Sequence, residues 1–140
     1  MKSQPSFKIR AAEVPMAQEK VLVYVIDDDQ SVRRGFQLLL LSAGFNVRTF
    51  SSAKEFLEGV NSKDSGLIIL DIRMPGITGL DLLKTLASRK TRMKIIAVSA
   101  FDDAKTKAFA RELGAVAYFQ KPVDGQALVD AVHWAMEGQE

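Results

Sequence analysis

The stretch Val21-Leu-Val-Tyr-Val-Ile-Asp-Asp-Asp29 joins a run of strand-forming residues directly to three consecutive carboxylates. A second apolar run, Leu67-Ile-Ile-Leu70, ends in the same way on Asp71. Carboxylates held within about 5 Å of each other repel by roughly 3 kcal/mol at an effective dielectric of 20. A folded protein therefore keeps such a cluster only where it is protonated, solvated or bound to a cation. The two strand ends predict one shared acidic pocket, and we expect the function of the chain to lie there.

The length and composition indicate one globular domain. The 140 residues suffice for a single core, and 47% hydrophobic with 26% charged residues is the balance of a folded protein. No apolar run approaches the ~20 residues needed to span a bilayer. The chain has no cysteine, which excludes disulfides and thiolate metal sites and agrees with a reducing compartment. We therefore expect a cytoplasmic protein without a membrane segment.

The net charge of +2 comes from the first twenty residues, whereas the remainder of the chain is balanced. A balanced domain lacks the basic face that general nucleic-acid binding needs, so no direct nucleic-acid partner is expected. Residues 1–20 contain no continuous apolar segment of the kind found in a secretory signal. We predict a flexible N-terminal arm over residues 1–20 and one folded domain over residues 21–140.

Apolar periodicity and turn residues predict five strands that alternate with five helices. Gly44 and Gly114 are natural helix stops, Ser51 and Ser52 offer N-caps for the second predicted helix, and Asp102 and Asp103 offer them for the fourth. The predicted strands are 21–26, 45–50, 67–71, 93–98 and 115–119, and the predicted helices are 31–43, 53–60, 80–88, 103–113 and 125–136. Apolar strands joined by helices indicate an α/β fold with a five-stranded, parallel, doubly wound sheet.

Polar residues follow four of the predicted strands, and in such sheets the site forms at the carboxyl ends of the strands. They are Asp27–Asp29, Asp71, Ser99 and Lys121. Clustered carboxylates suit a hard cation, most favourably Mg²⁺, and one of them could then attack a phosphoryl group. A lysine and a hydroxyl would contact the phosphoryl oxygens. The pattern predicts a phosphoryl-accepting aspartate.

The chain resembles the receiver domain of bacterial two-component response regulators over about residues 21–137. The motifs are Val-Ile-Asp-Asp-Asp at 25–29, Asp71-Ile-Arg-Met-Pro-Gly76 with Gly79, Ser99-Ala100 and Lys121-Pro122, each at the end of a predicted strand. The resemblance implies a flavodoxin-like sheet of strand order 2-1-3-4-5. It also implies a signalling domain that slowly loses its phosphoryl group and is not a turnover enzyme.

The resemblance further implies a Mg²⁺ site and a phosphoacceptor. Asp71 would accept the phosphoryl group and also contact the metal. Asp28 would bind Mg²⁺ directly, Asp27 would act mainly through a bound water, and the backbone carbonyl of Arg73 would complete the ligands of the protein.

The remaining residues implied by the resemblance concern the phosphoryl group and the switch. Ser99 and Lys121 would contact the phosphoryl group, and Tyr118 occupies the position of an aromatic residue whose ring turns inward when Ser99 shifts. Arg73 and Phe101 occupy variable positions beside the site. We predict that the bulky Phe101 hinders the attacking water and lengthens the life of the phosphorylated form.

The implied partners are a histidine kinase or histidine phosphotransfer protein upstream and an unidentified protein downstream, for a monomer or a phosphorylation-linked homodimer. Because only three residues follow Glu137, no output module is expected. Leu38 and Leu41 fall off the apolar face of the first predicted helix, one turn apart. They form either a docking strip for the kinase or ordinary exposed leucines. Trp134, off the apolar face of the last helix, is a candidate for a dimer or effector surface.

Two other functions remain open from the sequence. Asp27-x-Asp29-x-Ser31 resembles the nucleophile motif of haloacid dehalogenase-like phosphatases, with Asp27 as nucleophile and Asp29 as acid/base. That alternative leaves the Asp71 motif unexplained, and a helix N-cap is the favoured role of Asp29. The third possibility is a receiver-like scaffold that works without phosphorylation.

Overall fold

The computed structural model describes residues 22–61, 64–74, 76, 78–101 and 103–137. The strands are β1 (Leu22–Ile26), β2 (Asn46–Phe50), β3 (Leu67–Asp71), β4 (Lys94–Ser99) and β5 (Ala115–Gln120), and the helices are α2 (Gln30–Ser42), α3 (Ala53–Gly59), α4 (Gly79–Ser88), α5 (Ala104–Glu112) and α6 (Gly125–Glu137). Every predicted element is present, and its bounds differ from the predicted ones by no more than one residue. The predicted arm over residues 1–20 lies outside the described residues.

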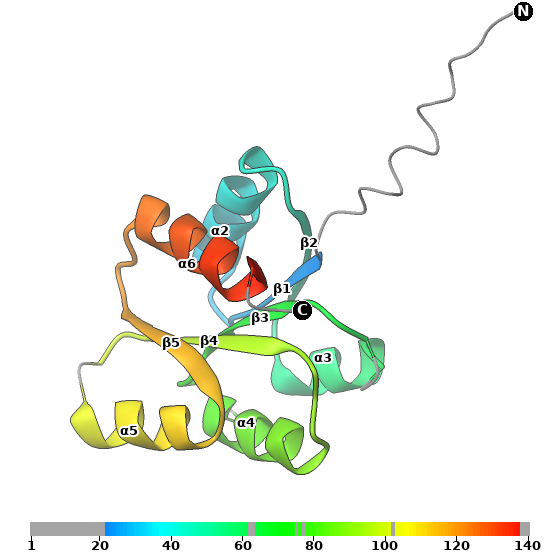
Figure 1. The fold of residues 1–140 in the computed structure, drawn as a ribbon, viewed down its shortest axis with the longest axis vertical. Helices are drawn as coiled ribbons and strands as arrows, with labels where there is room; N and C mark the ends of the chain where they lie inside the picture. The colour runs from blue at the N-terminus through cyan, green and yellow to red at the C-terminus, as the bar shows by residue number, and fades with distance from the viewer. Residues whose placement is uncertain (1–21, 62–63, 75, 77, 102, 138–140) are drawn as a thin grey trace, which may run out of the picture.

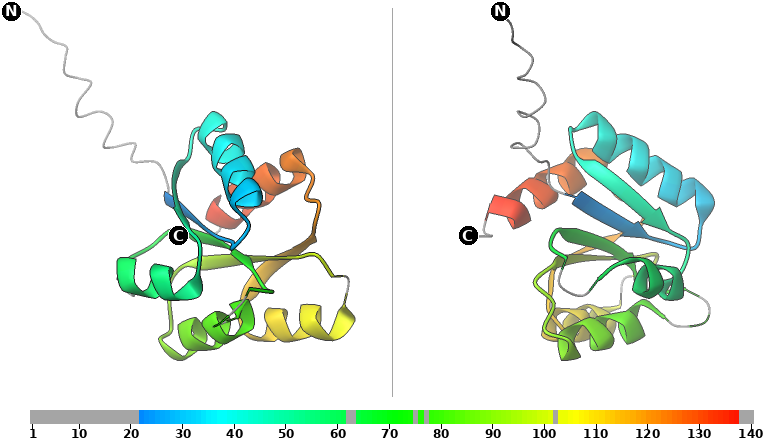
Figure 2. Two further views of the ribbon diagram at one scale, coloured as in Figure 1. Left: turned by 180° about the vertical axis from the view of Figure 1, so that it is seen from behind. Right: turned by 90° about the vertical axis from the view of Figure 1, so that its right-hand side faces the viewer.

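The five strands form one parallel sheet in the order β2-β1-β3-β4-β5. Helices α2 and α6 cover one face of the sheet, and α3, α4 and α5 cover the other, as Figure 1 shows from the front and Figure 2 from behind and from the side. The predicted α/β class and the strand order 2-1-3-4-5 are therefore confirmed. In this order β1 and β3 are neighbours, so their carboxyl ends meet at one place.

Alternation along the strands divides the core into two layers, because successive side chains of a strand point to opposite faces. Val23 and Val25 pack in the layer beneath α2 and α6. Tyr24 and Ile26 pack with Phe56 in the layer beneath the other three helices. Every residue of β3 is buried, as expected of a central parallel strand. Two packed layers therefore fix the strand ends that bear the polar residues.

The helix N-termini agree with the capping roles read from the sequence. The carboxylate of Asp29 accepts hydrogen bonds from the backbone N–H groups of Ser31 and Val32 and caps α2. Asp103 caps α5 in the same manner, whereas Asp102 lies outside the described residues. Asp29 is therefore turned toward its own helix. None of the helices in the described part of the chain is long and apolar enough to cross a membrane.

Gly79, the first residue of α4, lies against the end of β3, and its backbone N–H donates to the carbonyl of Ile72. A Cβ atom there would overlap the carbonyl oxygen of Asp71 and lie 2.6 Å from Cα of Ile72. We expect Gly79→Ala to lower the free energy of unfolding by about 1–3 kcal/mol, measured by urea denaturation. Gly35→Ala in α2 is the control, because its Cβ meets nothing within 4 Å. Equal stability of the two variants would contradict the expected overlap.

Candidate functional site

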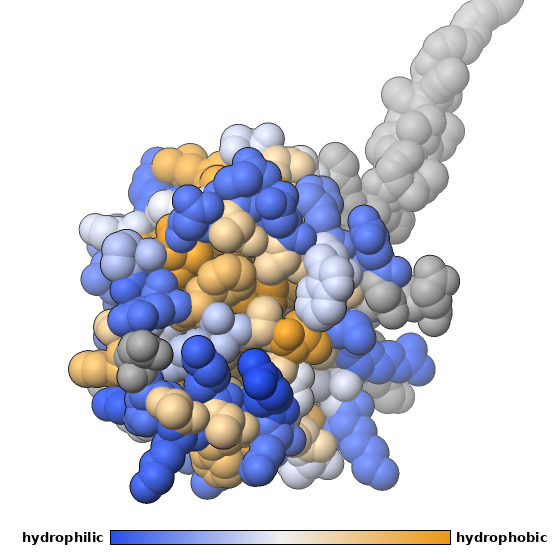
Figure 3. Space-filling model, turned by 60° about the vertical axis from the view of Figure 1, so that its left-hand side comes forward, coloured by the Kyte–Doolittle hydropathy of each residue, from blue (hydrophilic) through white to orange (hydrophobic). Residues whose placement is uncertain are grey.

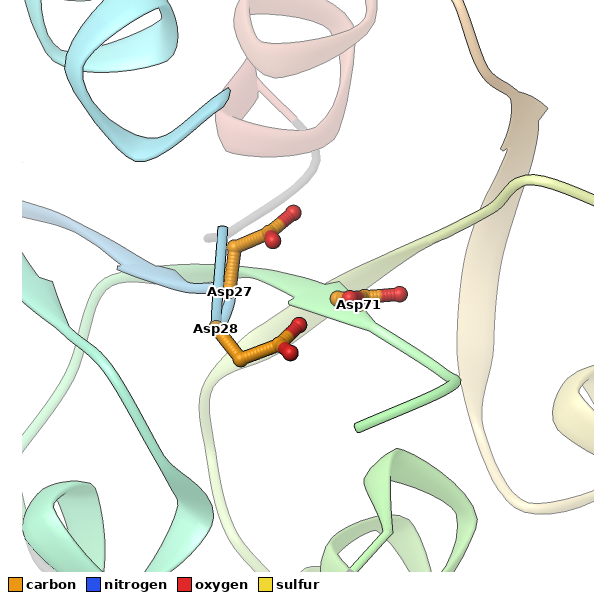
Figure 4. Close-up of side chains that lie close together, drawn as sticks. All are labelled: Asp27, Asp28 and Asp71. Carbon is orange, nitrogen blue, oxygen red and sulfur yellow. The ribbon is translucent and has the colours of Figure 1, made fainter. Parts of the chain in front are cut away.

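Three carboxylates meet where β1 and β3 end. Asp27 and Asp28 directly follow β1, Asp71 is the last residue of β3, and each offers an oxygen within 4.8 Å of the others. Figure 4 shows the three side chains converging from the two neighbouring strand ends. Asp27 is 1% exposed and Asp71 is 4% exposed, whereas Asp28 faces solvent. The structure thus brings together the acidic residues that the sequence separates by more than forty positions.

Lys121 adds a cation to this cluster from the end of β5. Its Nζ lies 2.9 Å from Oδ2 of Asp27 and 3.5 Å from Oδ2 of Asp71. Its backbone N–H donates to the carbonyl of Ser99 at 2.7 Å, which ties it to the neighbouring strand. Burial alone would lower the pKa of Lys121, but the charges and contacts of the two carboxylates raise it overall. Lys121 therefore remains protonated beside Asp71.

Asp71 is the strongly perturbed carboxyl of the cluster. Burial raises its pKa to about 6, and the negative charge of Asp27 adds to the rise. The ammonium of Lys121 and the backbone N–H of Arg73, which donates to Asp71 Oδ1 at 3.1 Å, act in the opposite direction. One lysine therefore does not compensate the negative charge gathered at this site.

The carboxylates fit a small divalent cation. Oδ1 of Asp27 accepts a hydrogen bond from the N–H of Asp29, and its buried Oδ2 is paired with the ammonium of Lys121. Ligand oxygens about 2.1 Å from an octahedral Mg²⁺ lie about 3 to 4 Å from one another, and the three carboxylate oxygens here all lie within 4.8 Å of one another. Asp27, Asp28 and Asp71 would hold the ion.

Ser99 ends β4 beside the carboxylates and is completely buried. Asp71 pairs with Val98 in the β3–β4 ladder, so the hydroxyl of Ser99 is one residue beyond that pairing. Its Oγ accepts a hydrogen bond from the backbone N–H of Phe101 at 3.1 Å. The backbone carbonyl of Arg73 remains a predicted metal ligand. The side chain of Arg73 packs over the ring of Phe101.

Phe101 connects Ser99 with Tyr118, and this link through Phe101 was not indicated by the sequence. Tyr118 donates from its hydroxyl to the carbonyl of Phe101 at 3.3 Å, and the guanidinium of Arg73 lies 4.4 Å from the centre of the Phe101 ring. Three contacts therefore meet at Phe101: its N–H donates to Oγ of Ser99 at the end of β4, its carbonyl accepts from Tyr118 of β5, and its ring stacks on Arg73 after β3. These contacts depend on loop conformation, so residue spacing alone carries no signal for them.

The three candidate docking residues are exposed: Leu38 by 54%, Leu41 by 48% and Trp134 by 60%. Beside Leu38 on α2, Gly35 opens a groove of about 460 Å³ between this helix and the segment after β5. Its lining residues are mostly apolar: Val32, Gly35, Phe36, Leu39, Lys121, Pro122 and Val123. The groove was not expected from the sequence, although a glycine among apolar helix residues is the signal that could have indicated it.

Fold and site define a doubly wound α/β domain with a carboxylate cluster and a lysine at the carboxyl edge of its sheet. The family model described as the response regulator receiver domain matches residues 23–133. The chain belongs to the response regulator receiver domain family, the signalling domains of two-component systems, which are not turnover enzymes and which interact with histidine kinases or phosphotransfer proteins. This finding gives no support to the haloacid dehalogenase-like alternative.

Several regulators and solved structures are similar to the chain. The transcriptional regulatory protein TdiR of Thauera aromatica is 43% identical over 81% of this chain and 50% of its own length. The transcriptional regulatory protein FixJ of Azorhizobium caulinodans is 41% identical over 81% of this chain and 54% of its own length. The structure of the response regulator StyR has a TM-score of 0.79 at 38% identity, covering 86% of this chain and 61% of StyR. The chain spans about half the length of the curated relatives it matches.

A CheY-like receiver domain protein from Methanospirillum hungatei aligns over nearly its whole length. Its structure has a TM-score of 0.81 at 25% identity and covers 86% of this chain and 97% of that protein. The flavodoxin-like arrangement of the five strands is therefore shared with a receiver domain of about the same size.

Proposed function

We propose that the chain accepts a phosphoryl group on Asp71 from a histidine kinase or histidine phosphotransfer protein, with Mg²⁺ bound at Asp27, Asp28 and Asp71. The observation that supports this proposal is the geometry around Asp71. This buried carboxylate lies within 4.8 Å of two others and 3.5 Å from the ammonium of Lys121. Such a group is both a nucleophile and a ligand of a hard cation.

The proposed reaction moves one phosphoryl group between two nucleophiles. A carboxylate oxygen of Asp71 attacks the phosphorus of a phosphohistidine, an oxygen–phosphorus bond forms, and the phosphorus–nitrogen bond breaks with its electron pair going to the imidazole nitrogen. The ammonium of Lys121 stabilises negative charge on one phosphoryl oxygen, and the hydroxyl of Ser99 donates to another. Bound Mg²⁺ supplies neutralisation of the negative charge among the carboxylates and phosphoryl oxygens.

The contacts of Ser99 and Tyr118 suggest how the phosphoryl group would reach a binding surface. The Oγ of Ser99 now accepts from the N–H of Phe101, and Tyr118 donates to the carbonyl of the same residue. If Ser99 turns toward a phosphoryl group, it shifts Phe101 and releases Tyr118. Phosphorylation then biases an existing two-state equilibrium through contacts made in one state alone.

The intact mass after treatment with acetyl phosphate tests this function. With Mg²⁺ present we expect a gain of about 80 Da, one phosphoryl group, that disappears when EDTA replaces the metal. Hydroxylamine should remove the added group, because it cleaves acyl phosphates. A protein that gains no mass under these conditions would instead act as a phosphorylation-independent scaffold.

We expect the exposed leucines of α2 to contact the phosphodonor protein. A double variant, Leu38→Glu with Leu41→Glu, should slow transfer from the cognate kinase by about 30-fold or more, the loss expected for two central interface residues. Gly35→Leu, which fills the neighbouring groove, should act in the same direction. The rate of uptake from acetyl phosphate should stay unchanged in both variants. Unchanged transfer from the kinase would show that these leucines are ordinary surface residues.

The stacked pair Arg73 and Phe101 predicts a long-lived phosphorylated form. An exposed cation–π contact is worth about 0.5–1 kcal/mol, so we expect Phe101→Ala to lose its phosphoryl group about 2–5 times faster. The half-life of the 80 Da adduct measures this rate. Phe109→Ala, a partly exposed phenylalanine on α5, is the matched control and should keep the wild-type half-life. Phe101 would have no shielding effect if both variants lost the group at the wild-type rate.

A further inference from the structure

A small polar pocket lies between the first half of α2 and the edge strand β2, which run side by side in both views of Figure 2. Its volume is about 150 Å³. Every described residue that lines it bears a polar or charged side chain, and we call these residues the two-arginine pocket: Gln30, Arg33, Arg34, Gln37 and Thr49. None of them belongs to the carboxylate cluster, so the pocket is a separate feature of the fold.

The two-arginine pocket differs from the groove on the other side of α2. The groove beside Gly35 is mostly apolar. Figure 3, which brings forward the side on which α6 begins, shows apolar side chains in a hollow with hydrophilic side chains around them. No aliphatic or aromatic side chain is found among the described residues that line the two-arginine pocket. An apolar ligand would therefore have nothing to cover there, and the pocket suits a polar ligand.

Most hydrogen-bond donors of the pocket are without partners in the described part of the chain. The side chains of Gln30, Arg34 and Gln37 make no hydrogen bond or ion pair with any described residue. Arg33 uses one donor, because its Nη1 donates to the backbone carbonyl of Asp27 at 2.8 Å. Since each guanidinium has five N–H donors, a ligand that enters the pocket would meet many donors at once.

The charge of the pocket is positive. Neither guanidinium forms an ion pair with a carboxylate of the described residues. Two acids of the adjoining segments are already bonded, since Asp29 caps α2 and Glu55 accepts from the N–H and the hydroxyl of Ser51. These bonds to Ser51 are the main cause of the lowered pKa of Glu55, and the charge of Arg33 adds to it. The positive charge is therefore felt nearby without being paired.

We propose that the two-arginine pocket binds the phosphoryl group of a small anion, either inorganic phosphate or a phosphate monoester. A phosphoryl group presents several acceptor oxygens, which guanidinium groups bind in pairs. The volume of about 150 Å³ is that of about five water molecules of the liquid, which accommodates such a group. A nucleic-acid backbone would pass over Asp28 and Asp29, whose exposed carboxylates next to the pocket would repel it.

One part of this proposal rests on the proposed function. Arg33 connects the pocket to the phosphorylation site, because it donates to the carbonyl of Asp27, one of the three proposed ligands of Mg²⁺. A cation at this position opposes the binding of a second cation nearby, and an anion in the pocket would offset its charge. Phosphate should therefore tighten the binding of Mg²⁺ by about fivefold, and Mg²⁺ should tighten that of phosphate equally, since such coupling is reciprocal.

Titration of the isotope-labelled full chain with inorganic phosphate in EDTA, followed by NMR, tests the site. We expect saturable shifts of the amides of Arg34 and Thr49, and Arg34→Gln should weaken binding at least about tenfold because it removes a charged donor. Arg89→Gln is the matched control, since this arginine is exposed at the C-cap of α4 and should not affect binding. An equal loss in the control, or shifts confined to Ser99 and Lys121, would overturn the proposal.

Other anions test the chemical class of the ligand. Glycerol phosphate should shift the same amides as phosphate does, and the tighter of the two identifies the ligand as a monoester or as the free ion. Succinate, a dicarboxylate, should bind more weakly than either. Succinate that binds as tightly as phosphate would overturn the assignment of a phosphoryl group, and duplex DNA that binds more tightly at Arg34 would overturn the assignment of a small anion.

Calorimetry of Mg²⁺ binding, with and without phosphate, tests the coupling separately. The wild type should gain affinity for Mg²⁺ in phosphate, whereas Arg34→Gln should not, and the variant also corrects for Mg²⁺ that phosphate binds in solution. If phosphate binds at the pocket without any change in Mg²⁺ affinity, the site is supported and the coupling through Arg33 fails. The titration in EDTA involves no phosphodonor, so its result does not depend on whether Asp71 accepts a phosphoryl group.

Discussion

The Asp71→Asn variant is expected to gain no phosphoryl group from acetyl phosphate and Mg²⁺, a complete loss of the 80 Da adduct. An amide has no negatively charged oxygen to attack phosphorus, and its nitrogen is a poor ligand for a hard cation. The fold has no reason to fail, because the side chain keeps its shape and its oxygen can still accept from the N–H of Arg73. The intact mass of the treated protein measures this result.

Two further variants separate the nucleophile from the cation ligands. Asp28→Asn retains Asp71 but removes an exposed carboxylate from the cluster, so uptake should continue at a rate lowered by at least about tenfold. Asp130→Asn makes the same chemical change on the exposed face of α6 and should take up the group as the wild type does. An adduct that forms in Asp71→Asn would assign the nucleophile to another carboxylate, with Asp27 as the first to examine.

The Asp71→Asn substitution should also raise the unfolding free energy of the metal-free protein at neutral pH. The pKa of Asp71 is raised to about 6 from 3.8, mainly by burial, so the folded state binds this proton more tightly than the unfolded state. The stabilisation is fully present below pH 3.8 and is lost as the pH rises through about 6. A shift of this size corresponds to about 3 kcal/mol. In EDTA at pH 7.5, Asp71→Asn should therefore exceed the wild type in unfolding free energy by up to about 3 kcal/mol.

Urea denaturation between pH 4.5 and 8 measures this difference. The two proteins should converge in stability toward the acid end, and Asp130→Asn should follow the wild type throughout. Mg²⁺ added at one hundred times its dissociation constant for the wild type should raise the unfolding free energy of the wild type by about 2.7 kcal/mol. It should raise that of Asp71→Asn less. If Asp71→Asn were less stable than the wild type at pH 7.5, the charge of the Asp71 carboxylate would be neutralised by its neighbours more fully than its burial indicates.

The elements and the main site residues were predictable because each depends on local pattern. Apolar runs that end on Asp27, Asp71 and Ser99 specify strands, and the parallel sheet then brings their ends together without further information. The N-cap role of Asp29 also followed from its position before a helix. Predicting such features requires only the pattern of a single strand or helix together with the general topology of parallel sheets.

The contacts around Phe101 could not be predicted for a physical reason. Its stacking on Arg73 joins the segments after β3 and β4, and its hydrogen bond to Tyr118 joins the segment after β4 to β5. Gly79 brings the start of α4 against the end of β3. The hydrophobic periodicity of a sequence does not indicate how two irregular segments pack against each other. The contacts of Lys84 with the Phe109 ring and of Lys107 with the Tyr118 ring were not predictable either. A surface lysine has the same sequence pattern whether its ammonium faces solvent or an aromatic ring.

The open sheet has two edge strands, β2 and β5, whose outer backbone groups have no neighbouring strand within the described residues. Such edges invite pairing with strands of other molecules, a common route to aggregation. A basic side chain lies at each one: Arg48 on β2, over the rings of Tyr24 and Phe50, and Lys107 beside β5. Positive charge at both borders would repel a second copy approaching edge to edge, so these cations should also keep the domain soluble at high concentration.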